Sequence, residues 1–334
     1  MSENREESGM MKGIQFKEFG GPDVLELIEM EIPAFSQDEV LIEVKAIGVN
    51  YADTARREGN YVVPTPLPFV PGAEIAGVVK KVGKNVQDIK EGMRVVTLIG
   101  SGGYAEYAVV HASQLIPIPK DVSFERAVAL PLQGLSAYHI LKTMGRLEEG
   151  ETVLVHAAAG GVGSIAVQLA KKIGAKKVIA TASTKEKLAF AKEMGANYTV
   201  NYSEEGWEKE IRELTDGKGV DLALEMVGGE VFNKTVKCLA AFGRLVIYGA
   251  ASGEQSEFDP RILMRRNQSI IGFFLPQIMN KPALYQKSLQ ELLEYMNNGE
   301  LVLTIGGTYP LSDAAKVHRK LQGRETKGKL VLLP

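Results

Sequence analysis

Cysteine is almost absent from this chain of 334 residues, which contains only Cys238. A single cysteine excludes a disulfide within the chain and any zinc site built from several cysteines. So little cysteine is typical of a reducing compartment, and the sequence therefore predicts a cytoplasmic protein. Histidine is also scarce. The four histidines have no catalytic or metal-binding motif around them, and we expect His156 to be a buried, hydrogen-bonded residue.

Long hydrophobic runs are lacking as well. No apolar segment approaches the roughly 18 residues that a membrane-spanning helix needs, and no charged start followed by an apolar stretch predicts a secretory signal. Neither sign of charge dominates, since 39 Lys and Arg stand against 41 Asp and Glu. This balance, without a groove of interleaved basic and aromatic residues, gives no reason to expect a nucleic acid or a membrane as partner.

The clearest positive signal is a strand, a glycine turn and a helix between Val153 and Ala175. A short apolar run is followed by small residues over 157–163, and apolar residues then recur at helical spacing until Gly174. A turn of this kind, taken alone, is as often a tight connection as a nucleotide site. The strand before it and the helix after it favour a dinucleotide site.

Each small residue of the turn has a physical role in such a site. Gly160 has no β-carbon, so a pyrophosphate can approach the backbone, and Gly163 lets the helix pack closely on the strand. Gly161 and Val162 begin the helix, whose N–H groups attract an anion. Ala158 replaces the first glycine of the pattern, which is acceptable only if its φ is negative.

The rest of the chain changes character along its length. Short candidate strands with frequent Gly and Pro turns over 12–119 predict an irregular, mostly antiparallel β domain. One helix is expected over 124–145, and strands then alternate with helices up to residue 274, which fits a doubly wound parallel sheet. The polar segment at the start has almost nothing to bury and predicts a disordered tail.

Four stretches give the chain a resemblance to a known family: GVNYADTARREGNY (48–61), residues 71–95, GETVLVHAAAGGVGSIAVQLAK (150–171) and GRLVIYGAAS (243–252). From Lys12 onward it resembles the zinc-free medium-chain dehydrogenase/reductases, and most of all the NADPH quinone oxidoreductases of the ζ-crystallin group. The resemblance implies an α/β fold in which a Rossmann doubly wound parallel sheet is inserted into a GroES-like irregular β domain. Its divisions would be a disordered tail (1–10), a GroES-like catalytic domain (11–129 plus 276–334) and a Rossmann dinucleotide-binding domain (130–275).

The resemblance also implies a homodimer formed through the Rossmann sheet edge, at residues 270–274. An apolar last strand can equally be covered within one subunit. Zinc-dependent relatives carry a cysteine and a histidine where this chain has Asn50 and Ala73, and a cysteine-rich lobe that is missing between residues 95 and 104. Glu74 remains, but one carboxylate is not a zinc site. We therefore predict a metal-free protein.

The residues after the second Rossmann strand indicate which cofactor is expected. NAD-binding folds place a carboxylate about 20 residues past the glycine turn, on the ribose 2′-hydroxyl. Here that strand ends in Ala182 and Ser183, and Lys187 follows. A hydroxyl and a cation favour a 2′-phosphate, so we predict NADPH; alternatively, Lys187 is only a solvated helix residue. By resemblance, Tyr202 and Arg324 also bind the phosphate.

Further candidates depend on the resemblance. Asn50 would lie beside the nicotinamide, where its amide donates to a substrate carbonyl or holds the ribose; alternatively, it only caps the helix that follows. Tyr51 and Tyr61 either line an aromatic pocket or belong to the core. Ala55 stands where the family often has another tyrosine. Gln133, which is a lysine in the family, and Ser136 are additional cofactor candidates. So are Gly228 and Gly249, which follow strand ends, and Phe273 at the sheet edge.

These residues predict an NADPH-dependent enzyme that transfers hydride to a quinone or a similar conjugated carbonyl. The alternative within the same chemistry is a reductase of 2-alkenals or enoyl compounds, and neither reaction needs a strong general base. Two other classes remain as alternatives: a nucleotide-loaded protein that binds RNA, and a membrane-trafficking adaptor. The composition argues against the first, and no amphipathic anchor supports the second.

Overall fold

The structure is a computed structural model that describes residues 9–334. The predicted tail over 1–10 therefore lies, up to residue 8, outside the described residues, and Met10 already begins a strand. The chain divides into two compact units, one ending at Leu132 and resuming over Thr304–Pro334, the other formed by Gln133–Leu303. The second unit is thus inserted into the first, as predicted.

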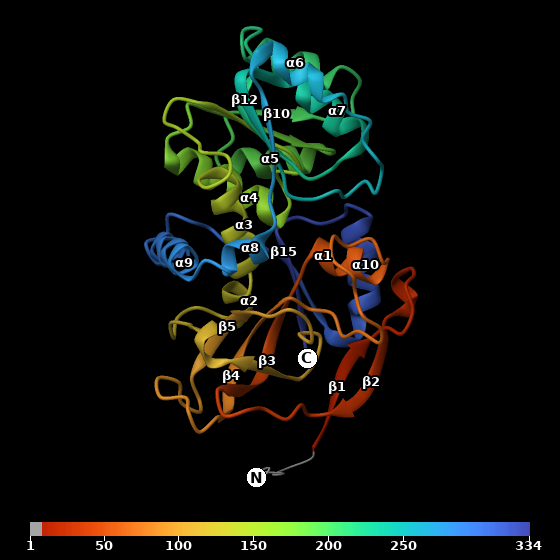
Figure 1. Ribbon diagram of the computed structural model, residues 1–334, viewed down its shortest axis with the longest axis vertical. Coiled ribbons are helices and arrows are strands. Elements are labelled where there is room, and N and C mark those ends of the chain that lie inside the picture. The colour runs from red at the N-terminus through yellow and green to blue at the C-terminus, as the bar shows by residue number, and fades with distance from the viewer. Residues whose placement is uncertain (1–8) are drawn as a thin grey trace. The chain divides into compact units, whose positions relative to one another are not determined.

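The first unit is built on a mostly antiparallel sheet. Its strand order is β14-β15-β3-β4-β5-β7, and β6 also pairs with β3. Figure 1 shows β3, β4 and β5 next to one another, with the pair β1 and β2 nearby. The bounds are β1 (Met10–Gln15), β2 (Glu26–Glu31), β3 (Glu39–Val49), β4 (Glu74–Val82), β5 (Arg94–Leu98), β6 (Tyr107–His111), β7 (Ile116–Pro117), β14 (Ile305–Pro310) and β15 (Lys329–Leu333).

Short helices and one apolar core complete this unit. The core is formed by alternate residues of the strands, whose side chains point to the same face of the sheet; Ile42, Val44 and Ile75 are among its members. The helices are α1 (Tyr51–Arg57), α2 (Phe124–Ala127) and α10 (Ala314–Gln322), with 3-10 turns η1 (Pro22–Val24), η2 (Ala112–Gln114) and η4 (Leu311–Asp313). The irregular β domain is therefore confirmed.

The second unit is a six-stranded, wholly parallel sheet in the order β10-β9-β8-β11-β12-β13. The order reverses at β8, which is the switch point expected of a doubly wound sheet. The fold class predicted from the sequence is confirmed. The strands are β8 (Thr152–Val155), β9 (Lys177–Ala182), β10 (Tyr198–Asn201), β11 (Val220–Glu225), β12 (Leu239–Ile247) and β13 (Ser269–Gly272).

Helices of this unit alternate with the strands along the chain. Two of these helices bury an apolar face in one core with strand residues. The buried residues of these faces are Trp207, Ile211, Phe232 and Val236. The helices are α3 (Pro131–Leu141), α4 (Gly161–Ile173), α5 (Lys185–Glu193), α6 (Trp207–Leu214), α7 (Gly229–Cys238), α8 (Leu275–Met279) and α9 (Pro282–Asn297), with η3 (Pro260–Arg266). Among residues 9–334, no helix has the length and apolar character to span a bilayer.

Two sequence-based expectations differ from this arrangement. The single helix expected over 124–145 is two helices, because Pro131 lacks an N–H donor and disfavours helical backbone before it. Residues 276–303, expected with the β domain, fall in the second unit. There the Glu291 carboxylate of α9 accepts hydrogen bonds from Tyr138 and Lys142 at 2.8 Å each. The functional division into domains stays a prediction.

His156 is an internal polar residue of the second unit, as expected. Its ring lies between two hydroxyls, with Nδ1 2.7 Å from Thr181 Oγ1 and Nε2 2.8 Å from Thr235 Oγ1. Because Thr235 donates to the Val231 carbonyl, it accepts from Nε2–H, and Thr181 donates to Nδ1. Burial lowers the pKa of His156 to about 3. The ring of Trp207, the only tryptophan, lies edge-on to it at 5.4 Å.

We predict that the second unit loses stability as the pH falls from 7 to 4.5. The unfolded chain binds a proton at His156 near its ordinary pKa of 6.5, and the folded chain does not until about 3. Stability therefore rises with pH through this window. His156→Gln should reduce the pH slope of the free energy of unfolding by about 1.4 kcal/mol per pH unit. Urea titrations followed by Trp207 fluorescence measure it.

The matched control is His111→Gln, which removes an exposed histidine from the other unit. It should leave the pH dependence of the Trp207 transition unchanged. An equal slope for the parent and His156→Gln would contradict the account of His156 as a histidine held neutral by burial.

Candidate functional site

The turn after β8 has the conformation that its sequence requires. The one left-handed residue is Ala157, with φ 48°, so Ala158 keeps a negative φ as the pattern demands. The N–H of Ala158 donates to the Thr181 carbonyl of β9 at 3.0 Å, and the N–H of Gly160 donates to the Ala157 carbonyl at 2.9 Å. These bonds fix the turn between the strand and α4.

The glycines of this turn are needed for different reasons. A β-carbon on Gly163 would lie 2.4 Å from the Ala157 carbonyl oxygen, so only glycine fits between helix and strand. A β-carbon on Gly161 would lie 2.1 Å from the amide of Gln133, which covers the start of α4. On Gly160 it would meet only the Ala157 oxygen, at 3.2 Å. The described residues thus leave open space in front of Gly160.

The beginning of α4 also presents unused donors. For the N–H groups of Gly161, Val162 and Gly163, residues 9–334 supply no hydrogen-bond acceptor. Three N–H groups at the positive end of a 13-residue helix form a favourable environment for an anion. Together with the space at Gly160, this arrangement fits a pyrophosphate.

The other candidates of this unit follow the carboxyl ends of the neighbouring strands. Because every strand pair is parallel, those ends lie along one edge of the sheet. Tyr202 after β10 donates its N–H to Ala182 of β9 at 3.3 Å, next to Ser183. A β-carbon on Gly249 would lie 3.2 Å from Met226, so the loops after β11 and β12 touch. The structure thus brings together Ala158, Gly160, Gly161, Val162, Gly163, Ser183, Tyr202, Gly228, Gly249 and Phe273 along this edge.

Buried polar groups fix two parts of that edge. The Glu225 carboxylate, at the end of β11, accepts the N–H groups of Val227 at 2.7 Å and Gly228 at 3.2 Å. Burial raises the pKa of Glu225, although these N–H donors oppose the shift. The Thr184 hydroxyl accepts the N–H of Lys187 at 3.3 Å and caps α5. The last residues of β9, up to Ser183, include no carboxylate.

Asn50, the main candidate of the first unit, lies between β3 and α1 and is only 4% exposed. Its backbone N–H donates to the Asp53 carboxylate at 2.8 Å, as one half of a capping box. Its side-chain Nδ2 donates to Glu74 Oε1 at 2.8 Å, and its Oδ1 accepts from Lys329 Nζ at 2.8 Å. The side chain therefore belongs to a buried polar cluster.

Lys329 is a partner of the candidate Asn50 that the sequence analysis missed. It forms an ion pair with Glu74 in which both side chains have no exposed surface. Glu74 Oε2 also accepts the N–H of Leu132, in the first turn of α3, at 2.9 Å. Glu74, dismissed from the sequence as a lone carboxylate, thus has three hydrogen-bond and charge partners in all: Lys329, Asn50 and the N–H of Leu132. The sequence did contain one signal of a buried charge, because Lys329 is the first residue of the otherwise apolar run KLVLL.

A second buried network adjoins this one. The Tyr104 hydroxyl donates to Asp53 Oδ2 at 3.4 Å and lies 3.0 Å from His318 Nε2. Arg57, fully buried, lies 3.2 Å from His318 Nδ1 and fixes that nitrogen as the acceptor. Burial raises the pKa of Asp53 to about 6, against the opposing effect of the N–H donors of Asn50 and Gly72.

The remaining candidates are less clearly placed. Tyr51 and Tyr61 are both partly exposed, and the Arg56 guanidinium stacks over the Tyr61 ring at 4.2 Å. Gln133 and Ser136 are buried in α3, at 8% and 6% exposure. Arg324 is exposed, with φ 57°, in the first unit, so the geometry does not join it to the sheet edge described above. Their roles stay predictions.

Two domain models and many known proteins match this chain. Residues 36–120 match the alcohol dehydrogenase GroES-like domain, and residues 161–309 match the domain described as zinc-binding dehydrogenase. A quinone oxidoreductase of Pseudomonas aeruginosa is 37% identical over 97% of this chain and all of its own length. This chain belongs to the quinone oxidoreductase family of medium-chain dehydrogenases/reductases.

Other family members extend the comparison. A 2-haloacrylate reductase from a Burkholderia species is 36% identical over 94% of this chain and 96% of its own. The structure of Escherichia coli quinone oxidoreductase, described as a complex with NADPH, has a TM-score of 0.91 and 35% identity over 97% of this chain and all of its own.

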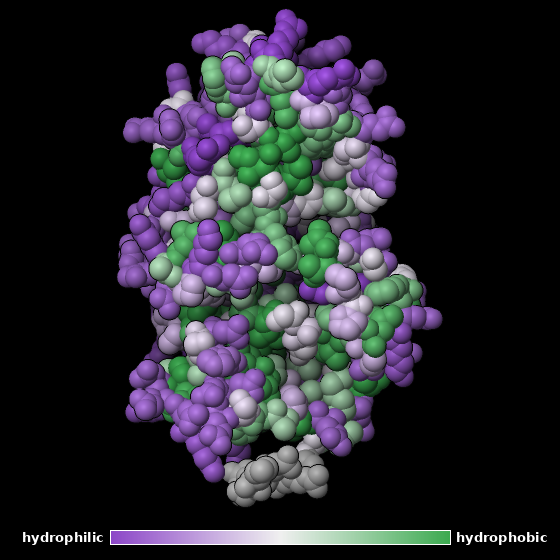
Figure 2. Space-filling model, viewed as in Figure 1, coloured by the Kyte–Doolittle hydropathy of each residue, from purple (hydrophilic) through white to green (hydrophobic). Residues whose placement is uncertain are grey.

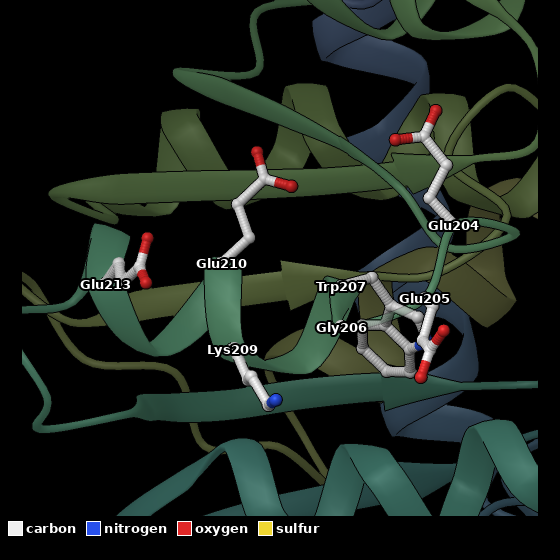
Figure 3. A pocket seen from close by; sticks show the side chains of 7 residues that line it. All are labelled: Glu204, Glu205, Gly206, Trp207, Lys209, Glu210 and Glu213. Atoms are coloured by element: carbon white, nitrogen blue, oxygen red, sulfur yellow. The ribbon is translucent and has the colours of Figure 1, made fainter.

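Two observations bear on other kinds of site. Within residues 9–334, no group of three or more His, Cys, Asp or Glu side chains is arranged to hold a metal ion. A surface pocket is lined by Glu204, Glu205, Gly206, Trp207, Lys209, Glu210 and Glu213, and Figure 3 shows several of these carboxylates directed outward from α6. Figure 2 shows hydrophilic side chains gathered over the end of the second unit where Figure 1 draws α6. None of the candidate residues lines this pocket.

The glycine turn allows a direct test of packing. We predict that Gly163→Ala lowers the free energy of unfolding by about 1–3 kcal/mol, as overpacking does, because its β-carbon would lie 2.4 Å from a backbone oxygen. Gly160→Ala adds the same methyl group where the described residues leave space, so its loss should stay below about 1 kcal/mol. Urea denaturation followed by Trp207 fluorescence compares the two variants. Equal stabilities would refute this packing account.

Proposed function

We propose that this chain is an NADPH-dependent, metal-free oxidoreductase that transfers hydride to a quinone. Membership of the quinone oxidoreductase family establishes the oxidoreductase class. The observation that carries the proposal is the single sheet edge where a glycine turn, free helix N–H groups and a strand end without a carboxylate occur together. These features match the three parts of NADPH that need recognition: pyrophosphate, ribose and 2′-phosphate.

The residues present fit this cofactor. The space at Gly160 and the N–H groups of Gly161, Val162 and Gly163 would bind the pyrophosphate. Ser183, Lys187 and Tyr202 would bind the 2′-phosphate. The rest of the NADPH molecule would lie along the same edge of the sheet, beside Gly228, Gly249 and Phe273. When bound, NADPH supplies the hydride, that is, two electrons and one hydrogen nucleus.

The substrate side needs binding and charge stabilisation rather than a strong base. A quinone that accepts hydride leaves an aromatic oxyanion, which takes one proton from solvent to give the hydroquinone. Hydrogen-bond donors directed at that oxygen lower the barrier. Asn50 would supply such a donor, while Tyr51 and Tyr61 would bind the flat ring of the substrate. Because Ala55 stands where the family often has a third tyrosine, this chain would have fewer aromatic rings around the substrate.

A reductase of 2-alkenals or enoyl compounds is the second candidate. It is supported by the similarity to a 2-haloacrylate reductase, whose name denotes reduction of a conjugated acid. An α,β-unsaturated carbonyl accepts hydride at its β-carbon and develops charge on its oxygen, so the same donor serves both reactions.

The donor set supports metal independence. A catalytic zinc needs about three protein ligands of the Cys, His or carboxylate type. Position 50 is an asparagine and position 73 an alanine, and the Glu74 carboxylate is already paired with an ammonium group. Oxidation of NADPH at an unchanged rate after dialysis against a chelator is the expected result. A cytoplasmic location is likewise proposed, from the cysteine content alone.

The experiment that tests the proposed function is an absorbance assay at 340 nm. The purified protein should oxidise NADPH with at least one of a panel of benzoquinones and naphthoquinones, faster than with a panel of 2-alkenals. Faster turnover of the alkenals would favour the second candidate. No oxidation with either panel would refute both.

The cofactor preference predicts the effect of one added carboxylate. Ser183→Asp places a negative charge at the end of β9, where it would repel a 2′-phosphate but accept a bond from a ribose hydroxyl. The Kd for NADPH should rise about 10-fold or more, while that for NADH changes by less than about 3-fold. Fluorescence titration of the bound nucleotide measures both values.

Asn197→Asp is the matched control, because it adds the same charge just before β10, at the opposite edge of the sheet. It should leave both nucleotide affinities unchanged. An equal loss of NADPH and NADH affinity in Ser183→Asp would show that Ser183 does not face the phosphate.

We also propose a homodimer through β13, the last strand of the six-stranded sheet. The strand is partly exposed, and the preceding η3 carries Ile262 and Met264 at 48% and 76% exposure. A second copy would cover this edge. Met264→Lys should shift the protein from dimer to monomer in sedimentation velocity. Val62→Lys, at an equally exposed position, should not; a monomeric parent would contradict the proposal.

A further inference from the structure

The most unusual group in the first unit is the ammonium of Lys329. Its side chain opens β15 and has no exposed surface. Within the described chain, two side-chain oxygens hold it: Oε1 of Glu74, in a close ion pair, and Oδ1 of Asn50, at 2.8 Å. A buried charge persists only when its partners are well placed, so this geometry is held firmly.

The ammonium determines which way the Asn50 amide faces. A lysine ammonium has only donors, so the atom of Asn50 that it contacts is the oxygen and never the NH₂ group. The NH₂ group is thereby directed away from Lys329. One of its N–H bonds goes to Glu74 at 2.8 Å, and the nearest acceptor for the other is the Gly48 carbonyl, at 3.3 Å. The second bond is slightly longer than the usual N–H···O range and therefore weak.

The backbone makes room for this arrangement. A β-carbon on Gly48 would lie 2.4 Å from Glu74 Oε1 and 2.7 Å from Lys329 Cε, so any larger residue would separate the pair. The other oxygen of Glu74 is fixed by the Leu132 N–H of α3. Strands β3, β4 and β15 and the start of α3 thus all contribute to the orientation of one amide.

We propose that Lys329 is a positioning residue that fixes the amide of Asn50 with its weakly bonded N–H available to the carbonyl oxygen of the substrate. The proposal deepens the proposed function and rests on it, because Asn50 is the substrate-side donor there. Without the ammonium, no described group holds the amide oxygen, so the amide can turn about its bond to Glu74 and its weakly bonded N–H loses its fixed direction. The charge that develops on the substrate oxygen during hydride transfer would then lack a donor held in place.

The first test replaces the ammonium by a neutral group of similar length. Lys329→Gln should lower kcat for quinone reduction about 10- to 100-fold, which is at most the loss of about 100-fold or more that removal of the donor itself causes. The KM for the quinone and the Kd for NADPH should change by less than about 3-fold, since the interaction strengthens in the transition state. Lys329→Arg keeps a donor-only cation and should retain most of the activity.

The second test asks whether Lys329 acts through Asn50. Asn50→Ala alone should lower kcat about 100-fold, and the double variant Asn50→Ala/Lys329→Gln should lower it no further. A purely structural role would instead make the two effects multiply. Multiplying effects, or a Lys329→Gln variant with the kcat of the parent, would overturn the proposal.

Folding and function are separated by two further variants. Lys329→Gln/Glu74→Gln removes both buried charges, so it should fold even if Lys329→Gln alone does not, and it should show the same low kcat. Gly48→Ala keeps every charge but separates the pair; it should lower kcat, whereas Gly100→Ala, which meets no neighbour, should not. A charge-free double variant with full activity would also overturn the proposal. An inactive parent would instead refute the proposed function.

Discussion

The desolvation of one ammonium group constrains the surroundings of Asn50 in the first unit. Removing a lysine charge from water costs several kcal/mol, which only close and well-oriented oxygens offset. Lys329 therefore requires Glu74 and Asn50 where they are, and these in turn require glycine at position 48. Because Asn50 also opens α1, its amide orientation and the start of that helix are fixed by the same set of contacts.

The candidate edge of the second unit follows from a different constraint, namely strand direction. When all strands of a sheet are parallel, every strand sends its following loop to the same edge. Small residues at those positions leave the edge open, and Glu225 fixes the loop after β11 with its carboxylate. A nucleotide site of this kind needs no dedicated cavity. It needs only that several loops lack side chains where a ligand approaches.

Much of this could be predicted from the sequence, because the signals were local. The glycine turn, its strand and helix, and the second strand without a carboxylate all follow from spacing and composition along the chain. The inserted order of the two units was instead implied by the resemblance to the family. The break before Pro131 is also a local signal, but apolar residues continue at helical spacing on both sides of it and hide the break. Residues 276–303 fall in the compact second unit for a different reason, since α9 is held by contacts of Glu291 with residues about 150 positions earlier in the chain.

The partners of Asn50 could not be predicted for the same reason of sequence distance. Lys329 lies 279 positions from Asn50, and nothing in the spacing of either residue points to the other. A helix cap and a substrate donor were therefore equally consistent with the sequence. In the structure Asn50 caps the helix through its backbone N–H, while the nitrogen and the oxygen of its amide each have a partner of their own. Capping the helix and donating to a substrate therefore do not exclude each other. A side chain whose oxygen is held by a cation can donate in only one direction, and that fixed direction is what a substrate oxygen requires.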